Sequence, residues 1–367
     1  MVSIARKNLF KEKTRLIISV SGVAFAVFLI IVIQGLYNGW KERITSYIKN
    51  IDASIWVGQA GSSDMFHSTS IIPITLKENL EKISGVKEVN RFLGRQIAFD
   101  LKGKKVNTYI VGFDTEKNIA GPVKVAEGKK VPQEGEIIID RVFTKNKNLK
   151  IGDVIKIGDK EFKVVGISEG GNMVIFQFSF ISQKEAEPLF QMKGLTNYFL
   201  VKTDGDVGKI ASNIKEKIPT VEARTKDEFI DENQKLVRET FLPIIYVLTI
   251  IALIIGISII GLTIYTATIE KLQEFGVLKA IGASNFQIYR VIFSQALISG
   301  ILGYFVGVIF SLFAVRIIEY LVPMFVVSIR AKDILIIFGI AVLMSIFASY
   351  IPVRRITKID PARVFRA

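Results

Sequence analysis

The stretch that decides the fold is residues 241–290, FLPIIYVLTIIALIIGISIIGLTIYTATIEKLQEFGVLKAIGASNFQIYR. Its first part, residues 241–269, carries no charged side chain, and at about 1.5 Å per helical residue it exceeds the roughly 30 Å hydrocarbon core of a bilayer. Charge returns at Glu270, and a second apolar run begins at Val291. The stretch therefore predicts two membrane-spanning helices joined by a short elbow.

The elbow carries the signals of an ordered break between two helices. Gly282 suits the left-handed conformation that closes a helix, and Ser284 with Gln287 has the S-x-x-Q spacing of a capping box that opens the next one. Apolar side chains at a membrane edge form an unusual patch when they are exposed, which indicates a protein partner. The elbow has four of them, Phe275, Val277, Leu278 and Ile281.

Two motifs resemble those of the FtsX-like permeases, the membrane subunits of MacB- and LolC-type ABC transporters. EKLQEFGVLKAIGAS, residues 270–284, is similar to the family element E-x-x-x-E-[FI]-G-[VI]-x-[RK]-A-[LI]-G-A-S. PVRRITKIDPARVFRA, residues 352–367, is similar to the family's closing signature, and the resemblance covers the full chain by order of segments. It implies that the elbow is a coupling helix that docks on a cytoplasmic ATPase, with the docking residues Glu270, Glu274, Phe275, Gly276, Val277, Leu278, Lys279, Ile281, Gly282, Ala283 and Ser284.

The alternative for the elbow is a face that meets only water at the inner membrane surface. Glu270, Glu274 and Lys279 fit that reading as well as they fit docking. The residues alone do not separate the two, and the resemblance favours docking. At the closing signature, Asp360 as N-cap and Pro361 at the first helical position predict the start of a short helix.

The composition places the chain in a membrane. The 367 residues are 50% hydrophobic with a formal charge of +14, and the apolar residues are concentrated in blocks. No basic stripe is interleaved with stacking aromatic residues in the expected soluble part, which argues against nucleic acid as a partner. Because there are no cysteines, disulfides, thiolate zinc sites and cysteine nucleophiles are excluded.

The distribution of positive charge predicts the orientation in the membrane. Basic side chains flank the first and the last apolar runs, so both termini are expected in the cytoplasm of a multi-pass protein of the cell membrane. They are Arg6, Lys7, Lys11, Lys13 and Arg15 before the first run, and Arg354, Arg355, Lys358, Arg363 and Arg366 after the last.

The expected fold is an α-helical membrane protein with four transmembrane helices plus an α+β extracytoplasmic domain inserted between helices 1 and 2. The first apolar run is longer than the apolar region of a secretory signal peptide, which has about 7–15 residues, and Tyr37 and Trp40 are expected as anchors at the outer interface. The predicted segments are the cytoplasmic N-terminus at 1–15, helix 1 at 16–40, the domain at 41–240, helix 2 at 241–269, the cytoplasmic elbow at 270–290, helix 3 at 291–315, an external turn at 316–333, helix 4 at 334–353 and the cytoplasmic C-terminus at 354–367.

The sequence of the inserted domain predicts two subdomains. A helix followed by a short strand occurs twice, once after a T-x-x-E capping box at Thr75 and Glu78 and once before TVEA, which suggests one α+β subdomain built from both ends of the insert. IAFDL and VNTYIVGF are expected to complete its sheet. Residues 134–170 predict a small β-rich subdomain with a VIKI and FKVVGI hairpin, similar to the one in MacB-like extracytoplasmic domains.

Two helix features remain open from the sequence. A capping box at Thr225 and Glu228 opens a stalk helix at about 226–240, which either continues into helix 2 or meets it at Pro243 as a separate helix. In helix 3, small residues four apart predict close approach of another helix, within the subunit or between subunits. They are Ser299, Gly303, Gly307 and Ser311.

The sequence lacks the motifs of several kinds of catalysis and transport. No G-x-x-x-x-G-K-[ST] phosphate loop occurs, so the chain is not expected to be an enzyme; it should hold no cofactor, and a partner ATPase should bind ATP and Mg. The four uncharged runs hold no titratable group of the kind used in proton relays, which argues against a secondary transporter. His67, the single histidine, is expected in an exposed loop, and with Asp64 and one of many serines it makes only a weak case for a membrane-anchored hydrolase.

The resemblance implies the permease subunit of an ABC transporter, coupling hydrolysis by a separate ATPase to movement of the extracytoplasmic domain. It also implies a dimer with a second copy or a paralogue, and a cargo such as a peptide, lipid or lipoprotein, with a periplasmic adaptor as a further partner. Two alternatives remain: a force transmitter that activates an external enzyme, and a membrane-tethered sensor or scaffold without an ATPase.

Overall fold

The computed structural model describes residues 12–66, 70–171, 177–322 and 325–357. The chain folds as two compact units, one made of Met1–Asn38 with Phe241–Ala367 and the other of Gly39–Thr240. The first unit consists of long apolar helices, and the second is an α+β domain that lies in the chain between the first two of them. The predicted fold class is therefore confirmed.

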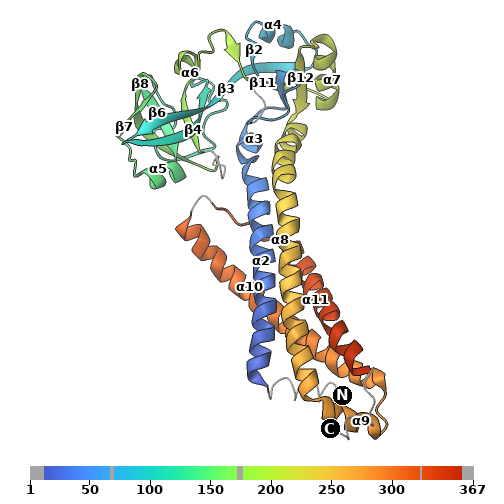
Figure 1. Cartoon of the computed structure of the whole chain (residues 1–367). Helices are drawn as coiled ribbons and strands as arrows, with labels where there is room; N and C mark the ends of the chain where they lie inside the picture. Colours follow the sequence, from blue (N-terminus) through green and yellow to red (C-terminus); the bar gives the residue numbers. More distant parts are fainter. Residues whose placement is uncertain (1–11, 67–69, 172–176, 323–324, 358–367) are drawn as a thin grey trace. The chain divides into compact units, whose positions relative to one another are not determined.

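Within the described residues, four helices are long and apolar enough to cross a membrane. Pro243 lies inside one of them, so the predicted stalk and the second span form a single helix that tolerates the missing backbone hydrogen bond. Figure 1 labels the four helices and the short elbow helix α9. Their bounds are α2 Lys13–Arg43, α8 Lys226–Glu270, α9 Leu272–Ala280, α10 Asn285–Leu321 and α11 Ala331–Thr357.

The third of these helices is longer than its apolar run. Arg316 and Glu319, which the sequence places in the external turn, are helical because α10 continues to Leu321. A helix satisfies its backbone hydrogen bonds internally, so charged side chains in water do not end it. The Glu319 carboxylate accepts a hydrogen bond from the Val327 backbone N–H at 3.3 Å, which draws the following connection back towards α10.

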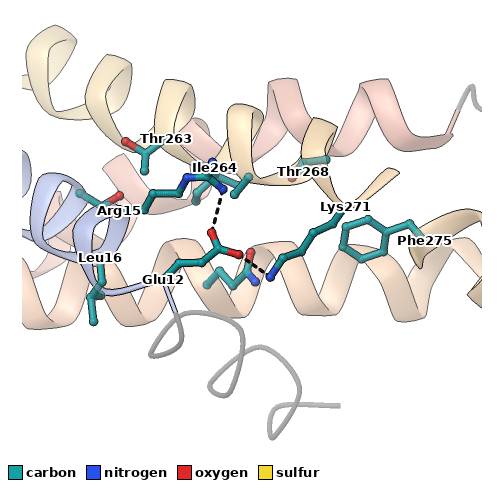
Figure 2. Close-up of a pocket in the computed structure, with 11 residues that line it drawn as sticks. Glu12, Arg15, Leu16, Thr263, Ile264, Thr268, Lys271 and Phe275 are labelled. Carbon is teal, nitrogen blue, oxygen red and sulfur yellow. Dashed lines mark hydrogen bonds and ion pairs between the residues drawn. The ribbon is translucent and has the colours of Figure 1, made fainter. Parts of the chain in front are cut away.

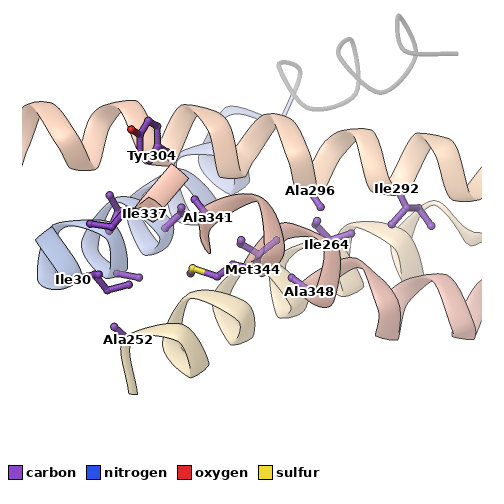
Figure 3. Packing of buried hydrophobic residues seen from close by; sticks show 14 of the residues in the cluster. Ile30, Ala252, Ile264, Ile292, Ala296, Tyr304, Ile337, Ala341, Met344 and Ala348 are labelled. Carbon is purple, nitrogen blue, oxygen red and sulfur yellow. The ribbon is translucent and has the colours of Figure 1, made fainter. Parts of the chain in front are cut away.

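The helices of the first unit pack through an apolar core. Figure 3 shows Ile30 of α2, Ala252 of α8, Ala296 of α10 and Met344 of α11 converging in it. Lipid tails are as apolar as these side chains, so the packing rests on close van der Waals contact. Small residues permit that contact: a Cβ added at Gly256 would collide with the Met344 side chain.

The connection between α10 and α11 lies against α2. The Ser328 backbone N–H donates to the Gly35 carbonyl at 2.9 Å, and the Asn38 side-chain amide donates to the Ser328 carbonyl at 3.2 Å. The same amide donates to the Asp333 carboxylate at 2.6 Å, and both of these side chains are buried. A buried carboxylate requires such a partner, so this contact anchors one end of α2 within the unit.

The second unit is built on a mixed sheet. Its strand order is β12-β1-β11-β3-β4-β9-β6-β8-β5, with β7 paired to β8, and β2 and β10 form a separate pair. The strands are β1 Ile55–Gln59, β2 Ile72–Pro73, β3 Val86–Leu101, β4 Lys104–Phe113, β5 Lys124–Gly128, β6 Glu136–Asp140, β7 Val154–Ile157, β8 Lys160–Glu169, β9 Phe178–Ser182, β10 Leu195–Thr196, β11 Tyr198–Thr203 and β12 Val221–Thr225. The helices are α3 Ser46–Asn50, α4 Leu76–Glu81, α5 Arg141–Lys147, α6 Gln183–Phe190 and α7 Val207–Lys217.

The long strand β3 belongs to two hydrophobic cores. Its first half contributes Val89 to a core with Leu80 of α4 and Ile214 of α7, so the predicted subdomain built from both ends of the insert is present. Its second half contributes Phe99 to another core, with Phe143 of α5. Figure 1 shows β3 passing from one group of elements to the other.

One strand assignment is corrected. IAFDL and VNTYIVGF belong to the second half of β3 and to β4, which continue the same sheet, but their buried side chains pack in the β-rich core and not in the core of the first subdomain. The predicted hairpin is present: β7 pairs with β8 from Val154 opposite Lys163 to Ile157 opposite Lys160. Gly158 starts its two-residue turn with a φ of +62°, which glycine adopts without strain.

The two capping boxes predicted around the insert differ in outcome. At Thr225 the box is formed: the Thr225 N–H donates to the Glu228 carboxylate at 2.8 Å, and the Glu228 N–H donates to the Thr225 hydroxyl at 3.3 Å. At Thr75 the prediction is wrong. Its backbone is already helical, with φ −59° and ψ −25°, and its side chain makes no cap hydrogen bond. A cap requires extended backbone at this position to aim the hydroxyl at the first turn.

Candidate functional site

The elbow is closed by a complete turn motif at the end of α9. The Gly282 N–H donates to the Lys279 carbonyl at 3.0 Å, and the Ala283 N–H donates to the Leu278 carbonyl at 2.9 Å. This is the pairing of a Schellman motif, which needs a left-handed residue at its centre. Gly282 supplies it with a φ of +97°.

A side-chain cap fixes the start of the next helix, α10. The Gln287 N–H donates to the Ser284 hydroxyl at 3.3 Å, and the Ser284 N–H donates to the Gln287 side chain at 3.0 Å, which forms the predicted capping box. One residue, Ala283, separates Gly282 from this cap. The elbow is therefore a fixed turn between two helices.

The helix α9 is apolar on two opposite sides. Phe275 is 7% exposed and lies in the membrane-unit core, and Leu278 packs against that core. Val277 is 45% exposed and Ile281 is 75% exposed. Residues four apart share a face of a helix, so Val277 and Ile281 form an outward apolar stripe.

The remaining predicted docking residues are divided between these sides. Glu270, Glu274, Gly282 and Ser284 are exposed, Gly276 is buried, and Lys279 and Ala283 are half-buried. Phe275 and Leu278, two of the predicted docking residues, lie on the side of α9 that the bundle covers. The structure adds Phe286, which is 73% exposed on the first turn of α10 and which the sequence motif does not include.

A chain of four charges ties the start of α2 to the elbow. The Glu12 carboxylate accepts from Arg15 Nη1 at 2.8 Å and lies 2.6 Å from Lys271 Nζ, as Figure 2 shows. Arg15 also pairs with Glu270. Burial alone would raise the pKa of Glu12, but hydrogen bonds from Lys271 and Arg15 hold that pKa below its ordinary value.

The network sits beside a small cavity. Its volume is about 30 Å³, and its lining includes Ser19, Thr268 and Gln295, all of which are buried. Phe275 lies on the same cavity, next to Lys271 (Figure 2). This partly polar cavity is therefore the place where the start of α2, the end of α8 and the elbow meet.

The small residues of α10 lie against α2 of the same chain. A Cβ added at Gly303 would be 2.5 Å from Val23 Cβ, and one added at Gly307 would be 2.7 Å from the Ala24 carbonyl oxygen. Ser299 and Ser311 are fully buried, and the Ser311 hydroxyl donates to the Gly307 carbonyl at 2.7 Å.

The sequence also singled out His67, Asp64, Asp360 and Pro361. His67, Asp360 and Pro361 lie outside the described residues. Asp64 is buried, and its backbone carbonyl accepts a hydrogen bond from the Tyr198 hydroxyl at 2.7 Å. Across the part of the chain that the structure describes, no group of three or more His, Cys, Asp or Glu residues could hold a metal ion.

Comparison with known proteins gives two family matches. The family described as MacB-like periplasmic core domain matches residues 16–217, and the family described as FtsX-like permease C-terminal matches residues 246–361. Both matched regions include candidate membrane helices; the first covers most of the inserted domain, to residue 217, and the second includes the elbow.

The similar relatives span the chain. A protein of Mycobacterium tuberculosis named an uncharacterized ABC transporter permease is 22% identical over 377 residues, covering 100% of this chain and 99% of that protein. A permease of the same description from Methanocaldococcus jannaschii is 24% identical over 409 residues, covering 100% and 97%. The macrolide export ATP-binding/permease protein MacB of Bartonella quintana is 20% identical, covering 95% of this chain and 57% of that protein.

Proposed function

This chain belongs to the FtsX-like ABC transporter permeases that carry a MacB-like periplasmic core domain, and on that premise we propose that its elbow receives work from a separate cytoplasmic ATPase. The four apolar helices make it a membrane protein. We further propose that both termini and the elbow are cytoplasmic and that the inserted domain is extracytoplasmic, as the positive charges at both ends of the chain favour.

The nucleotide belongs to the partner in this scheme. The sequence has no phosphate-binding loop of the G-x-x-x-x-G-K-[ST] type, so ATP and Mg would be bound by the ATPase subunit. A relative named both ATP-binding protein and permease is covered over 57% of its length, which supports the permease role for this chain. This chain would therefore supply no catalytic residue.

The observation that carries the docking proposal is the outward apolar stripe of α9. Val277, Ile281 and the neighbouring Phe286 are exposed on a segment that also bears Glu270 and Glu274. Apolar anchors surrounded by charged groups are typical of the centre of a protein interface. The Schellman turn and the capping box both lie between α9 and α10, so they would pass a push on this surface into α10, whereas α8 meets α9 across the single residue Lys271.

The cargo is proposed to be a peptide, lipid or lipoprotein, and the working unit a dimer with a second copy or a paralogue. Val, Ile and Met side chains fill the interior of the described bundle. This supports a scheme in which the cargo does not pass through a pore inside the bundle. Work would instead move the extracytoplasmic domain, which could also meet an adaptor. The ATPase activity distinguishes this transporter from a force transmitter that activates an external enzyme. In a force transmitter, the external partner alone would stimulate the ATPase, and no cargo would.

Replacing Ile281 with aspartate tests docking. We expect Ile281→Asp to insert and fold normally but to weaken ATPase binding by about 2 kcal/mol or more, roughly 30-fold, because a charge replaces an interface anchor. The wild-type chain is purified from native membranes, the ATPase is identified by its nucleotide-binding motif, and its recovery with each variant is quantified.

The matched control is Ile71→Asp, an equally drastic change at an isoleucine 43% exposed in the inserted domain. It should leave ATPase recovery unchanged. Gly282→Pro should also lose the ATPase, because proline cannot adopt a φ of +97°. Normal recovery of the ATPase with Ile281→Asp and Gly282→Pro would reject this docking surface. Phe275→Asp is unsuitable as a test, because Phe275 is part of the core.

A further inference from the structure

Two helices continue from the membrane unit into residues of the inserted domain, and they connect differently to the elbow. The helix α8 ends at Glu270, and the single residue Lys271 separates it from α9, so the backbone connects it directly to the elbow. The helix α2 begins at Lys13, far away in sequence, and in the described part of the chain side-chain ion pairs join its start to the elbow. A push on the elbow could therefore slide α8 along α2, unless those side chains hold.

The four-charge network is placed to prevent such sliding. Glu12 and Arg15 lie at the start of α2, whereas Glu270 and Lys271 are adjacent residues at the start of the elbow. The charges alternate in the order Lys271, Glu12, Arg15, Glu270, so each of the two α2 residues has a partner on the elbow. The side chains of Glu12, Arg15 and Lys271 are only 27%, 27% and 17% exposed, which limits screening within these three charges, whereas Glu270 is 62% exposed and its pair with Arg15 is the more screened one.

The packing above the network also joins α2 to its neighbours. Gly22 of α2 receives the Ile259 side chain of α8, since a Cβ there would collide with it. Val23 packs into the space left by Gly303 of α10. The buried Asn38 amide holds Asp333 near the other end of α2. Interlocked helices of this kind move together or shift by discrete steps, because a dense core does not deform continuously.

We propose that the Glu12–Arg15–Glu270–Lys271 network is a clamp that makes α2 follow the elbow, so that α2 and α8 deliver the ATPase's work to the extracytoplasmic domain as one body. This inference rests on the proposed function. Glu12 and Arg15 are positioning residues in it, and they contribute nothing to ATPase docking itself.

The test uses the full chain in complex with its ATPase in lipid nanodiscs. Because the chain has no cysteine, Lys156→Cys gives one labelling site, an exposed position in the inserted domain, for an environment-sensitive fluorophore. ATPase recovery reports docking, and the ATP-dependent change in fluorescence reports movement of the domain. Arg15→Gln and Glu12→Gln remove the clamp, and Lys13→Gln is the matched control, because Lys13 is an exposed cation two residues from Arg15.

The expected results distinguish a coupling role of the four charges from a role in folding alone. Arg15→Gln and Glu12→Gln should keep ATPase recovery but lose at least about five-fold of the ATP-dependent signal, whereas Lys13→Gln keeps it. Arg15→Lys, which retains the charge, should restore at least half of the signal.

Each other outcome has a definite meaning. Full signal in both Arg15→Gln and Glu12→Gln would overturn the clamp. Should Arg15→Gln fail to assemble, Glu12→Gln decides: a lost signal in an assembled complex supports the clamp, and a full signal overturns it. If the wild-type chain recovers no ATPase, the proposed function fails first, so the two failures are distinguishable.

Discussion

At the scale of single residues, Asp140 shows how a capping side chain can be tuned by burial. Its carboxylate accepts from the Val142 N–H at 2.8 Å as the N-cap of α5, and the residue is 2% exposed. Burial disfavours its charged form and raises its pKa to about 6, against the lowering effect of the backbone hydrogen bonds and of Arg43. The ionised cap therefore costs folding free energy at neutral pH.

The sign of the pH dependence follows from the raised pKa. Between the ordinary value of 3.8 and about 6, the folded protein holds a proton that the unfolded chain releases. The contribution of Asp140 to stability is therefore largest below pH 4 and falls by roughly 2–3 kcal/mol as the pH rises through 6.

Asp140→Asn should remove this dependence while keeping a good N-cap. At pH 7.5 we expect the variant to melt several degrees above the wild type, and at pH 4 the two should melt together. Tryptophan fluorescence during heating measures this, because Trp40 and Trp56 both belong to the Gly39–Thr240 unit. A variant that melts below the wild type at pH 7.5 would contradict the raised pKa.

At the scale of elements, the contact of α10 with α2 depends on glycine. Gly303 leaves no room for a side chain, because an added Cβ would be 2.5 Å from Val23 Cβ and 3.0 Å from the Val20 carbonyl oxygen. Such a contact needs no polar partner in lipid, only close backbone approach.

Gly303→Ala should consequently loosen the bundle. We expect a loss of about 1–3 kcal/mol from overpacking, measured as a lower midpoint of unfolding in SDS-containing mixed micelles. The matched control is Gly339→Ala on α11, where an added Cβ meets nothing within 4 Å; it should be neutral or slightly stabilising. If Gly303→Ala instead changed only the monomer–dimer ratio, the small-residue stripe would serve self-association.

At the scale of the whole molecule, the order of segments determines which parts share a side of the membrane. In the proposed topology one span precedes the inserted domain and one span separates that domain from the elbow, so the two lie on opposite sides of the membrane. The helix α8 runs from Lys226 to Glu270 through Pro243 without a break, so a single helix connects them in the chain.

Cysteine labelling of intact cells tests this topology. The absence of native cysteine makes single substitutions unambiguous. An impermeant maleimide should label Lys145→Cys in the inserted domain and spare Ser284→Cys, which should react only after permeabilisation; both positions are exposed. Labelling of Ser284→Cys from outside would invert the orientation and remove the elbow from the reach of a cytoplasmic ATPase.

Local features were predictable because a few neighbouring residues decide them. Gly282 with its left-handed turn and the Ser284 and Gln287 box depend on backbone groups within one helical turn, and both are present. The prediction of a capping box at Thr75 was wrong because residue spacing does not determine the backbone conformation. The spacing fits a box, but the backbone at Thr75 is already helical.

The sequence by itself determined the apolar spans, the inserted domain and the ordered elbow, because length, hydrophobicity and turn chemistry are local properties. Only the tertiary structure decided which side of α9 is free, since Phe275 and Ile281 are both apolar and the bundle covers just one of them. It alone brought Arg15 to Glu270 and Gly303 to Val23, because contacts between residues far apart in the chain leave no signal in spacing.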